Sequence, residues 1–391
     1  MRRPARPPVR ALALVVVALL VVGCWVALQR GAHGYYTFAP GSAPRITASA
    51  QCKAGSAGGD LTLPGGTPCA RLDVPGAKRH AIDGSLYMVD VLVGPATPGE
   101  YLLSKLGLLH TFHEGMQLLP AKDVLGTTPP QQLQCQGVQQ MAGATSIAAV
   151  VALRRLGYQV RENDLGAQLY QVEPGSPAAA AGLRCNDVVI AVNGAPVRTA
   201  EDLVRAIHEA RPGQSVTIAL RRTVNGKAVT KDLVAKLTGT PAISGQGPAK
   251  PSQAFLGVVA EPDTTFVFPF DVSIHVGNIG GPSAGLALTL GLLDVLSGGR
   301  LTGGHRIAAT GTISLDGSVG VIGGVAQKAV AVRRAGAQTF LVPPQNLEAA
   351  RSGAGSMKVL AVSSLQQALD DLAAIGGQIP APTPATPAAA R

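Results

Sequence analysis

Ser283 is the residue best placed for nucleophilic chemistry. It stands in the segment Gly280-Gly281-Pro282-Ser283-Ala284-Gly285, directly before an apolar run from Leu286 to Leu296. Proline suits the first turn of a helix because its missing N–H is not needed there, so we predict a buried helix that begins near Pro282 or Ser283. N–H groups near Gly281 and Ser283 could then hold an oxyanion while the serine hydroxyl attacks an acyl carbon. The alternative is that Ser283 only caps this helix.

Lys328 is the first candidate for the base that a nucleophilic serine needs. In the glycine-led segment 323–332, Val325, Lys328, Ala329 and Val332 recur at helical spacing, which places the lysine on the core-facing stripe of a helix. Burial disfavours the ammonium form, so the pKa of Lys328 should fall and a neutral amine should become available. The alternative is that the side chain reaches water along its aliphatic stem.

His275 and His305 are the other candidate bases by residue type. Neither is accompanied by an aspartate in an identifiable triad, and a lone histidine in or beside a strand is more often a hydrogen-bonded structural residue.

The elements around these residues resemble the proteolytic domain of Lon proteases. Three spaced motifs carry the resemblance: Gly281 to Gly285, Thr310 to Gly317, and Val321-Ile322-Gly323-Gly324 followed by Lys328. Strands are expected at Phe340–Val342 and Val359–Val362. The resemblance implies an α/β proteolytic domain over residues 254–376, with Ser283 as nucleophile, Lys328 as base, Thr310 helping to hold the lysine, and Gly281 and Pro282 in supporting positions.

Two positions depart from the Lon pattern. Many Lon proteases carry an acidic residue where this chain has Gly280, and a glutamate where it has Thr312. The sequence also contains no G-x-x-x-x-G-K-[ST] segment, which a fused ATPase would need. The expected activity is therefore ATP-independent cleavage of peptides or loosely folded segments.

Residues 166–238 resemble a bacterial PDZ domain, a small sandwich of strands with one long helix. The resemblance rests on Glu173 to Ala178, Ala181-Gly182-Leu183, Asn186 to Val189 and Val192-Asn193-Gly194. We predict the helix over Ala200 to Ala210, with Thr199 as its N-cap. The resemblance implies a groove between this helix and the strand after Gly166 that adds a peptide as a further strand. Leu165-Gly166-Ala167 would form the loop that receives a terminal carboxylate.

The N-terminus predicts export. Residues 11–28 are apolar throughout, close to the ~20 residues that span a bilayer, and Arg2, Arg3, Arg6 and Arg10 precede them. By the positive-inside rule, residues 1–30 would be a cytoplasmic tip and a single transmembrane anchor, with the catalytic domain outside the cytoplasm at the cell membrane. A cleaved signal peptide and a lipoprotein signal that ends at Cys24 are the alternatives.

The other four cysteines are Cys52, Cys69, Cys135 and Cys185, an even number in a compartment that permits disulfides. The closeness of Cys52 to Cys69 favours that bridge, although three pairings are possible and free buried thiols are the alternative. No Cys or His spacing is typical of zinc, and we expect no metal or other cofactor.

The remaining segments carry no motif. Residues 31–165 read as a juxtamembrane and N-terminal extracytoplasmic region with a strand near Leu86–Leu92 and a helix near Met141–Leu156. Residues 239–253 are a predicted linker, and residues 377–391 a Pro/Ala-rich, disordered tail. The whole chain is therefore predicted to be of the α+β class.

The formal charge of +10 does not point to nucleic acid, because the basic residues form no stripe and few aromatics accompany them. The leading hypothesis is a serine endopeptidase that acts on peptides or unfolded proteins. A catalytically inert PDZ scaffold is the main competitor, and an esterase or amidase for small molecules is a third reading. The Lon resemblance also implies a ring, with a hexamer as the first expectation.

Overall fold

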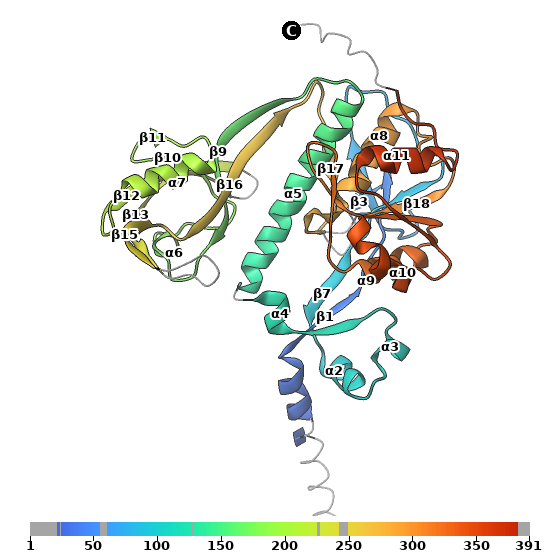
Figure 1. The fold of residues 1–391 in the computed structure, drawn as a ribbon, viewed down its shortest axis with the longest axis horizontal. Coiled ribbons are helices and arrows are strands. Elements are labelled where there is room, and N and C mark those ends of the chain that lie inside the picture. The colour runs from blue at the N-terminus through green and yellow to red at the C-terminus, as the bar shows by residue number, and fades with distance from the viewer. Residues whose placement is uncertain are drawn as a thin grey trace, which may run out of the picture.

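The computed structural model of the chain describes residues 22–23, 25–54, 61–126, 128–224, 227–241 and 249–381. It shows a larger body, which contains the candidate residues Ser283 and Lys328 and is named the catalytic body after them, and a smaller β-rich body on opposite sides of the long helix α5 (Pro130–Arg155) (Figure 1). Most of the predicted anchor, much of the predicted linker and the end of the predicted tail lie outside the described residues. Within the described ranges, no helix combines the length and the apolar character needed to cross a bilayer.

The catalytic body is built on a mixed seven-stranded sheet. Its order is β17 (Ser273–His275), β5 (Cys69–Asp73), β2 (Arg45–Thr47), β6 (Ser85–Tyr87), β18 (Arg306–Ala309), β21 (Thr339–Val342) and β22 (Lys358–Ala361). The last two strands confirm the prediction for residues 340–342 and 359–362 to within a residue at their ends. Three strands of this sheet come from residues 31–165, which differs from the sequence interpretation of that region as a juxtamembrane segment.

Helix α8 (Gly285–Ser297) forms the centre of the catalytic core. A 3-10 turn, η1 (Pro282–Ala284), leads into it, and eleven of its residues, from Gly285 to Val295, are buried. Gly291 lets strand β2 approach, because a Cβ at this position would lie 2.6 Å from Ile46 Cγ2. The prediction of a buried helix that begins near Pro282 or Ser283 is confirmed.

Shorter elements complete the catalytic body. They are the hairpin β3 (Lys53–Ala54) and β4 (Leu61–Thr62), the pair β19 (Thr312–Ile313) and β20 (Val319–Gly320), and the helices α9 (Val325–Arg334), η2 (Pro344–Asn346), α10 (Leu347–Ala354) and α11 (Leu365–Ala373). A disulfide joins Cys52 to Cys69 beside the hairpin, as predicted.

Helix α5 begins at Pro130, well before the Met141 that the sequence predicts. Its first eleven residues are rich in glutamine and have no apolar periodicity, so local pattern gave no signal there. The tertiary structure supplies the missing stabilisation, since α5 packs against α8 and η1 while a second disulfide, Cys135–Cys185, ties it to the β-rich body.

The β-rich body holds a sheet of order β13 (Lys227–Lys236), β12 (Ser215–Val224), β10 (Val188–Val192), β9 (Arg161–Val172) and β16 (Val258–Val267), with β11 (Ala195–Pro196) beside β10. Helix α6 (Pro177–Ala180) and α7 (Ala200–Glu209) accompany it, and Thr199 caps α7 as predicted. Strands β14 (Thr238–Thr240) and β15 (Lys250–Phe255) pair where the sequence predicted a linker. Strand β16 lies inside the segment that the sequence analysis gave to the proteolytic domain.

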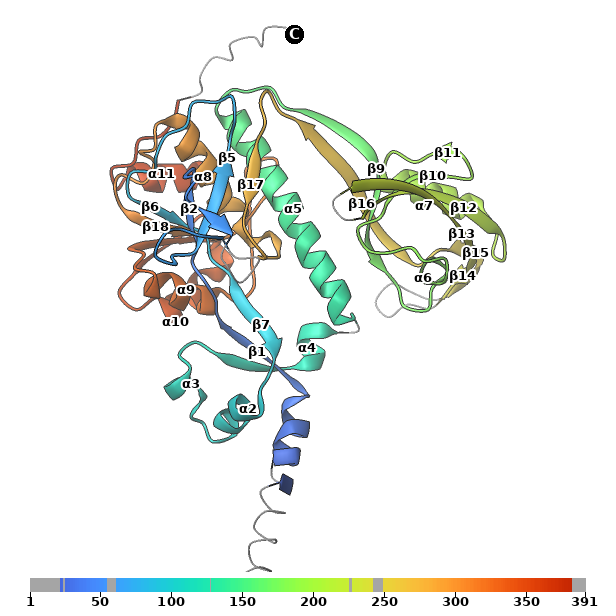
Figure 2. The same cartoon turned by 180° about the vertical axis from the view of Figure 1, so that it is seen from behind.

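A third, smaller unit lies next to the N-terminal helix, which covers residues 25–32 (Figure 2). It contains the sheet β7 (Val91–Pro95), β1 (Tyr35–Pro40) and β8 (Gln117–Pro120), with helices α2 (Pro98–Lys105), α3 (Leu109–Phe112) and α4 (Ala121–Leu125). We name residues 35–40 and 91–125 the basal lobe.

Asp294, near the end of α8, is a buried carboxyl that weakens the core at high pH. Its Oδ1 accepts the Leu301 N–H at 2.8 Å, while Oδ2 has no hydrogen-bond partner among the described residues. Burial, with a smaller contribution from the charge of Asp83, raises the pKa of Asp294 to about 6 from 3.8. A raised folded pKa favours folding at low pH, and the advantage is lost as pH rises through 6.

We predict that Asp294→Asn is more stable than the parent at pH 8 by about 3 kcal/mol, because the amide keeps the acceptor for Leu301 without a buried charge. At pH 4 the two proteins should have nearly the same free energy of unfolding. Denaturant titrations at both pH values measure the difference, and an equal gain at pH 4 and pH 8 would contradict the charge argument.

Candidate active site

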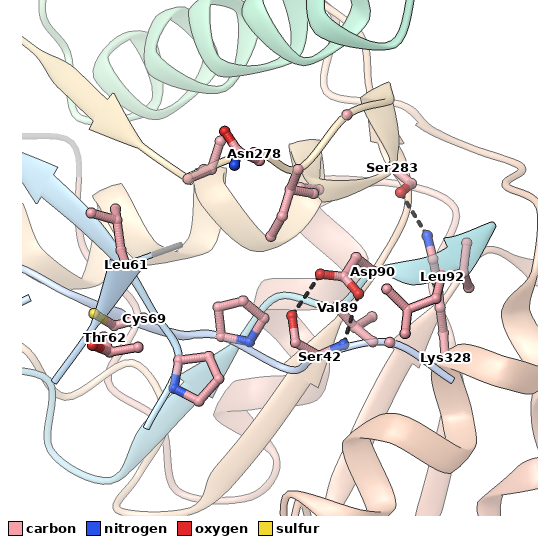
Figure 3. A pocket seen from close by; sticks show the side chains of 18 residues that line it. Ser42, Leu61, Thr62, Cys69, Val89, Asp90, Leu92, Asn278, Ser283 and Lys328 are labelled. Atoms are coloured by element: carbon pink, nitrogen blue, oxygen red, sulfur yellow. Dashed lines mark hydrogen bonds between the residues drawn. The ribbon is translucent and has the colours of Figure 1, made fainter. Parts of the chain in front are cut away.

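Ser283, Lys328 and Thr310 meet in one place. Lys328 Nζ lies 2.6 Å from Ser283 Oγ and 3.3 Å from Thr310 Oγ1. The serine comes from η1, the lysine from α9, and the threonine follows β18, so three separate elements converge. Figure 3 shows the side chains of Ser283 and Lys328 pointing toward each other. The structure therefore brings together the three side chains to which the Lon resemblance gave chemical roles.

Ser283 is fixed from both directions along the chain. Gly281, the residue before η1, has φ +88°, a conformation that favours glycine, and Pro282 opens the turn. On the far side, the Ser283 carbonyl accepts the Gly311 N–H at 2.9 Å. The hydroxyl is thus presented at the mouth of a helix whose body is locked in the core.

Lys328 is buried, with 2% of its surface exposed. Burial lowers the pKa of its ammonium to about 8, and the nearby Asp90 carboxylate acts in the opposite direction. Helix α9 positions it by starting at Gly324, which adopts the left-handed conformation at φ +66°. The alternative in which this side chain reaches water is wrong for this structure.

Thr310 orients the amine. Its Oγ1 donates to the Ser283 carbonyl at 3.1 Å, which leaves the oxygen lone pairs free to accept from Lys328 Nζ. The side chain is completely buried, so no water competes for these contacts. With one N–H directed at Thr310, a neutral Lys328 can turn its lone pair toward the Ser283 hydroxyl.

Ser283 and Lys328 open onto a pocket of about 700 Å³. One wall comes from the β3–β4 side, where Leu61, Thr62 and the disulfide-bonded Cys69 line it, and another from the loop around Asn278 (Figure 3). Such a volume is large enough for a short stretch of peptide.

Asp90 is the acidic side chain of this pocket. Its carboxylate accepts from the Ser42 N–H at 2.7 Å and from Ser42 Oγ at 2.6 Å. Gly41 makes room for it, because a Cβ there would overlap Asp90 Oδ1. The sequence analysis missed Asp90, although an acidic residue inside the apolar run Leu86–Leu92 was an available signal.

The Gly281 N–H is already occupied. It donates to the Gly137 carbonyl of α5 at 2.7 Å. The expectation that the Gly281 N–H helps to hold an oxyanion is therefore wrong for this conformation, because that N–H is already hydrogen-bonded to α5. The N–H groups of Ser283 and Ala284, in the first turn where helical partners are lacking, are the donors that remain suitable.

Helix α5 also explains why a glycine and not an acidic residue stands at position 280. A Cβ on Gly280 would lie 3.2 Å from the backbone carbon of Gly137, so an acidic side chain at this position would press against α5. The departure from the Lon pattern thus has a steric reason in this chain. Nothing in the sequence around Gly137 signals this contact.

The two histidines lie outside this pocket. His275 Nε2 is 3.2 Å from Asp73 Oδ2 on β5, and His305 Nε2 is 3.1 Å from the Ile375 carbonyl. Neither residue lines the pocket of Ser283. They serve as structural residues here.

The predicted carboxylate loop is wrong. Leu165, Gly166 and Ala167 lie inside β9, where Ala167 pairs with Val189 on one side and with Pro262 on the other. Because both edges of β9 are taken, no peptide can add at this point. Among the residues that the structure describes, the unpaired edge next to α7 belongs to β16. A pocket between them is lined by Ala200, Glu201, Val204, Arg205, His208, Glu209 and Ala260.

Comparison with known proteins agrees with these two bodies. Residues 155–234 match the family model described as PDZ domain, and residues 260–373 match that of the Lon protease (S16) C-terminal proteolytic domain. Among solved structures, the PDZ domain of the SdrC-like protein from Listeria monocytogenes is 21% identical, with a TM-score of 0.20, and covers 25% of this chain and 87% of that one.

Curated relatives match the C-terminal part. Lon protease 2 of Bacillus subtilis is 33% identical over 109 residues, which cover 27% of this chain and 19% of that protein. Lon protease 1 of Herpetosiphon aurantiacus is 39% identical over 89 residues, or 22% of this chain and 11% of that protein. The chain thus spans less than a fifth of the length of these relatives. It contains a PDZ domain and the C-terminal proteolytic domain of Lon proteases, which is a serine peptidase domain.

Proposed function

We propose that this chain is an ATP-independent serine endopeptidase that cleaves peptides and unfolded protein segments outside the cytoplasm. The observation that carries the proposal is the 2.6 Å contact between Lys328 Nζ and Ser283 Oγ, made by an amine that burial has shifted toward its neutral form. An inert scaffold would gain nothing from keeping a lysine dry beside a serine, because an unpaired buried amine costs stability.

The reaction is acyl transfer. Neutral Lys328 takes the Ser283 proton while Oγ attacks the peptide carbonyl, and the N–H groups of Ser283 and Ala284 hold the oxyanion. The Lys328 ammonium then gives its proton to the leaving amine, and an acyl ester remains on Ser283. Lys328 next removes a proton from water, which attacks the ester, and the proton returns to Ser283 as the acid product leaves.

The substrate class follows from the absence of any ATPase signature in the sequence and from the shape of the site. Without a motor to unfold proteins, the enzyme would accept only segments that enter a 700 Å³ pocket unaided. The free edge of β16 beside α7 would bind a peptide as an added strand and hold it near the protease.

Location at the membrane is supported by the apolar segment 11–28 and by the arginines before it. The two disulfides also favour an oxidising compartment. A single-pass anchor with its N-terminus in the cytoplasm would place the catalytic body outside. A ring of several chains remains a prediction from the Lon resemblance.

We predict that Ser283→Ala and Lys328→Ala each lower cleavage of an unfolded protein substrate by at least about 10³-fold, because each removes one half of the dyad. Ser352→Ala and Lys358→Ala, exposed residues of the same types in the same domain, should leave the rate unchanged. Turnover of a fluorescently labelled casein by the purified full chain measures the effect. Equal cleavage by all five proteins would exclude the dyad, and no cleavage by any of them would favour the inert scaffold.

We predict that activity is lost as pH falls through about 8, since protonated Lys328 cannot act as base. Asp90→Asn should move this acidic limb to lower pH, because it removes the carboxylate that raises the pKa of Lys328, while its amide can still bond to Ser42. Initial rates of the parent and of Asp90→Asn from pH 5 to 10 measure the acidic limb of each protein. A limb that stays in place, or moves to higher pH, would contradict the charge relation between Asp90 and Lys328.

A further inference from the structure

The basal lobe exposes an unusual number of large apolar side chains. Helix α2 buries none of its residues, and the two most open side chains of the lobe, Leu92 and Phe112, are 62% and 65% exposed. The other members of this group are Val93, Leu102, Leu106 and Leu108. Large apolar side chains exposed in this number on one small lobe indicate a contact with another apolar body.

The lobe is fixed to the end of the N-terminal helix. Gly31 packs on Tyr101 of α2 so closely that a Cβ there would lie 2.6 Å from the ring. Tyr101 also contacts Tyr35, with ring centroids 5.4 Å apart, and Lys105 Nζ lies 5.2 Å from the centre of the Tyr101 ring. Figures 1 and 2 both show α2 and α3 beside this helix, at the end of the molecule from which it emerges.

This attachment sets a short distance from the proposed anchor to the lobe. The apolar segment ends at Leu28, and Gly31 follows three residues later in the same helix, which is a rise of about 5 Å. The headgroup layer of one leaflet is roughly 5 to 8 Å deep. An anchor that ends at Leu28 would therefore hold Tyr101 and α2 within the headgroup layer.

The polar residues of the lobe suit the same location. Tyr35 and Tyr101 form an aromatic pair of the kind found at membrane–water interfaces, and Lys105 and Lys122 can bind lipid phosphates. Two of the acidic groups are engaged elsewhere, since Glu100 completes the cap of α2 and Glu114 pairs with Arg333 and Arg334.

We propose that the basal lobe docks on the outer leaflet of the membrane, with the apolar side chains of α2 and α3 entering the boundary between headgroups and acyl chains. The inference rests on the proposed anchor, which brings the bilayer to this surface. A second copy of the chain is the other possible occupant, and it would have to compete with a bilayer that is always within reach.

The single tryptophan of the chain allows a direct test. The full-length protein is reconstituted into phosphatidylcholine–phosphatidylglycerol vesicles with or without lipids brominated near the top of the acyl chains. The parent reports on the anchor through Trp25. Leu106→Trp and Phe112→Trp, each made with Trp25→Phe, report on the lobe, and Val234→Trp in the same background is the control, because Val234 is 62% exposed on β13 of the other body.

Docking predicts that brominated lipid lowers the fluorescence of Leu106→Trp and Phe112→Trp by about half or more, and leaves Val234→Trp unchanged. If the lobe tryptophans are not quenched while Trp25 of the parent is, the docking is overturned and the anchor stands. If neither the lobe nor Trp25 is quenched, the docking and the proposed anchor both fall. Proteolytic activity is measured separately in detergent, so neither outcome bears on the Ser283–Lys328 chemistry.

Discussion

The removal of one lysine amine from water is the constraint on which the rest of the catalytic body depends. A shift of the Lys328 pKa from 10.5 to about 8 corresponds to about 3 kcal/mol against the ammonium form. The protein sustains this cost by packing α9 against the sheet and by giving the amine two hydroxyl partners, Ser283 and Thr310. The chemistry of the serine is thus a product of core packing.

Helix α5 connects the two halves of the molecule at the site itself. Its Gly137 carbonyl takes the Gly281 N–H two residues before the nucleophile, and nearby its Gln139 side chain donates to the Leu169 carbonyl of β9. The Cys135–Cys185 disulfide fixes the same stretch of helix covalently to the PDZ domain. The loop before Ser283 is therefore shaped by a helix that the PDZ domain holds.

The sequence pointed to the dyad through two local patterns, a proline-led apolar helix for Ser283 and helical periodicity for Lys328. Each pattern left an alternative open, and the resemblance to Lon proteases decided between them. The sequence did not predict β2 and β5, because strands of three to five residues show no clear alternation and pair with partners far along the chain. The same reason explains the misplaced carboxylate loop, since β9 and β16 are separated by most of the PDZ domain. The single strand predicted near Leu86–Leu92 is divided into β6 and β7 in the structure. The contact of Gly137 with the loop before Ser283 became visible only in the structure, where distant segments meet.

Because β9 pairs with β16, the PDZ domain is an insertion into the catalytic body and not a separate domain in a linear series. The outgoing and returning strands stay paired, with two register shifts, down to Arg161 and Val267, so the two points where the chain leaves and re-enters are neighbours in space. Residues between these two points could be exchanged or enlarged while β9 and β16 stay paired, provided that Cys185 and the Leu169 carbonyl keep their contacts with α5. The architecture thus permits the inserted domain to vary while the catalytic body keeps its fold.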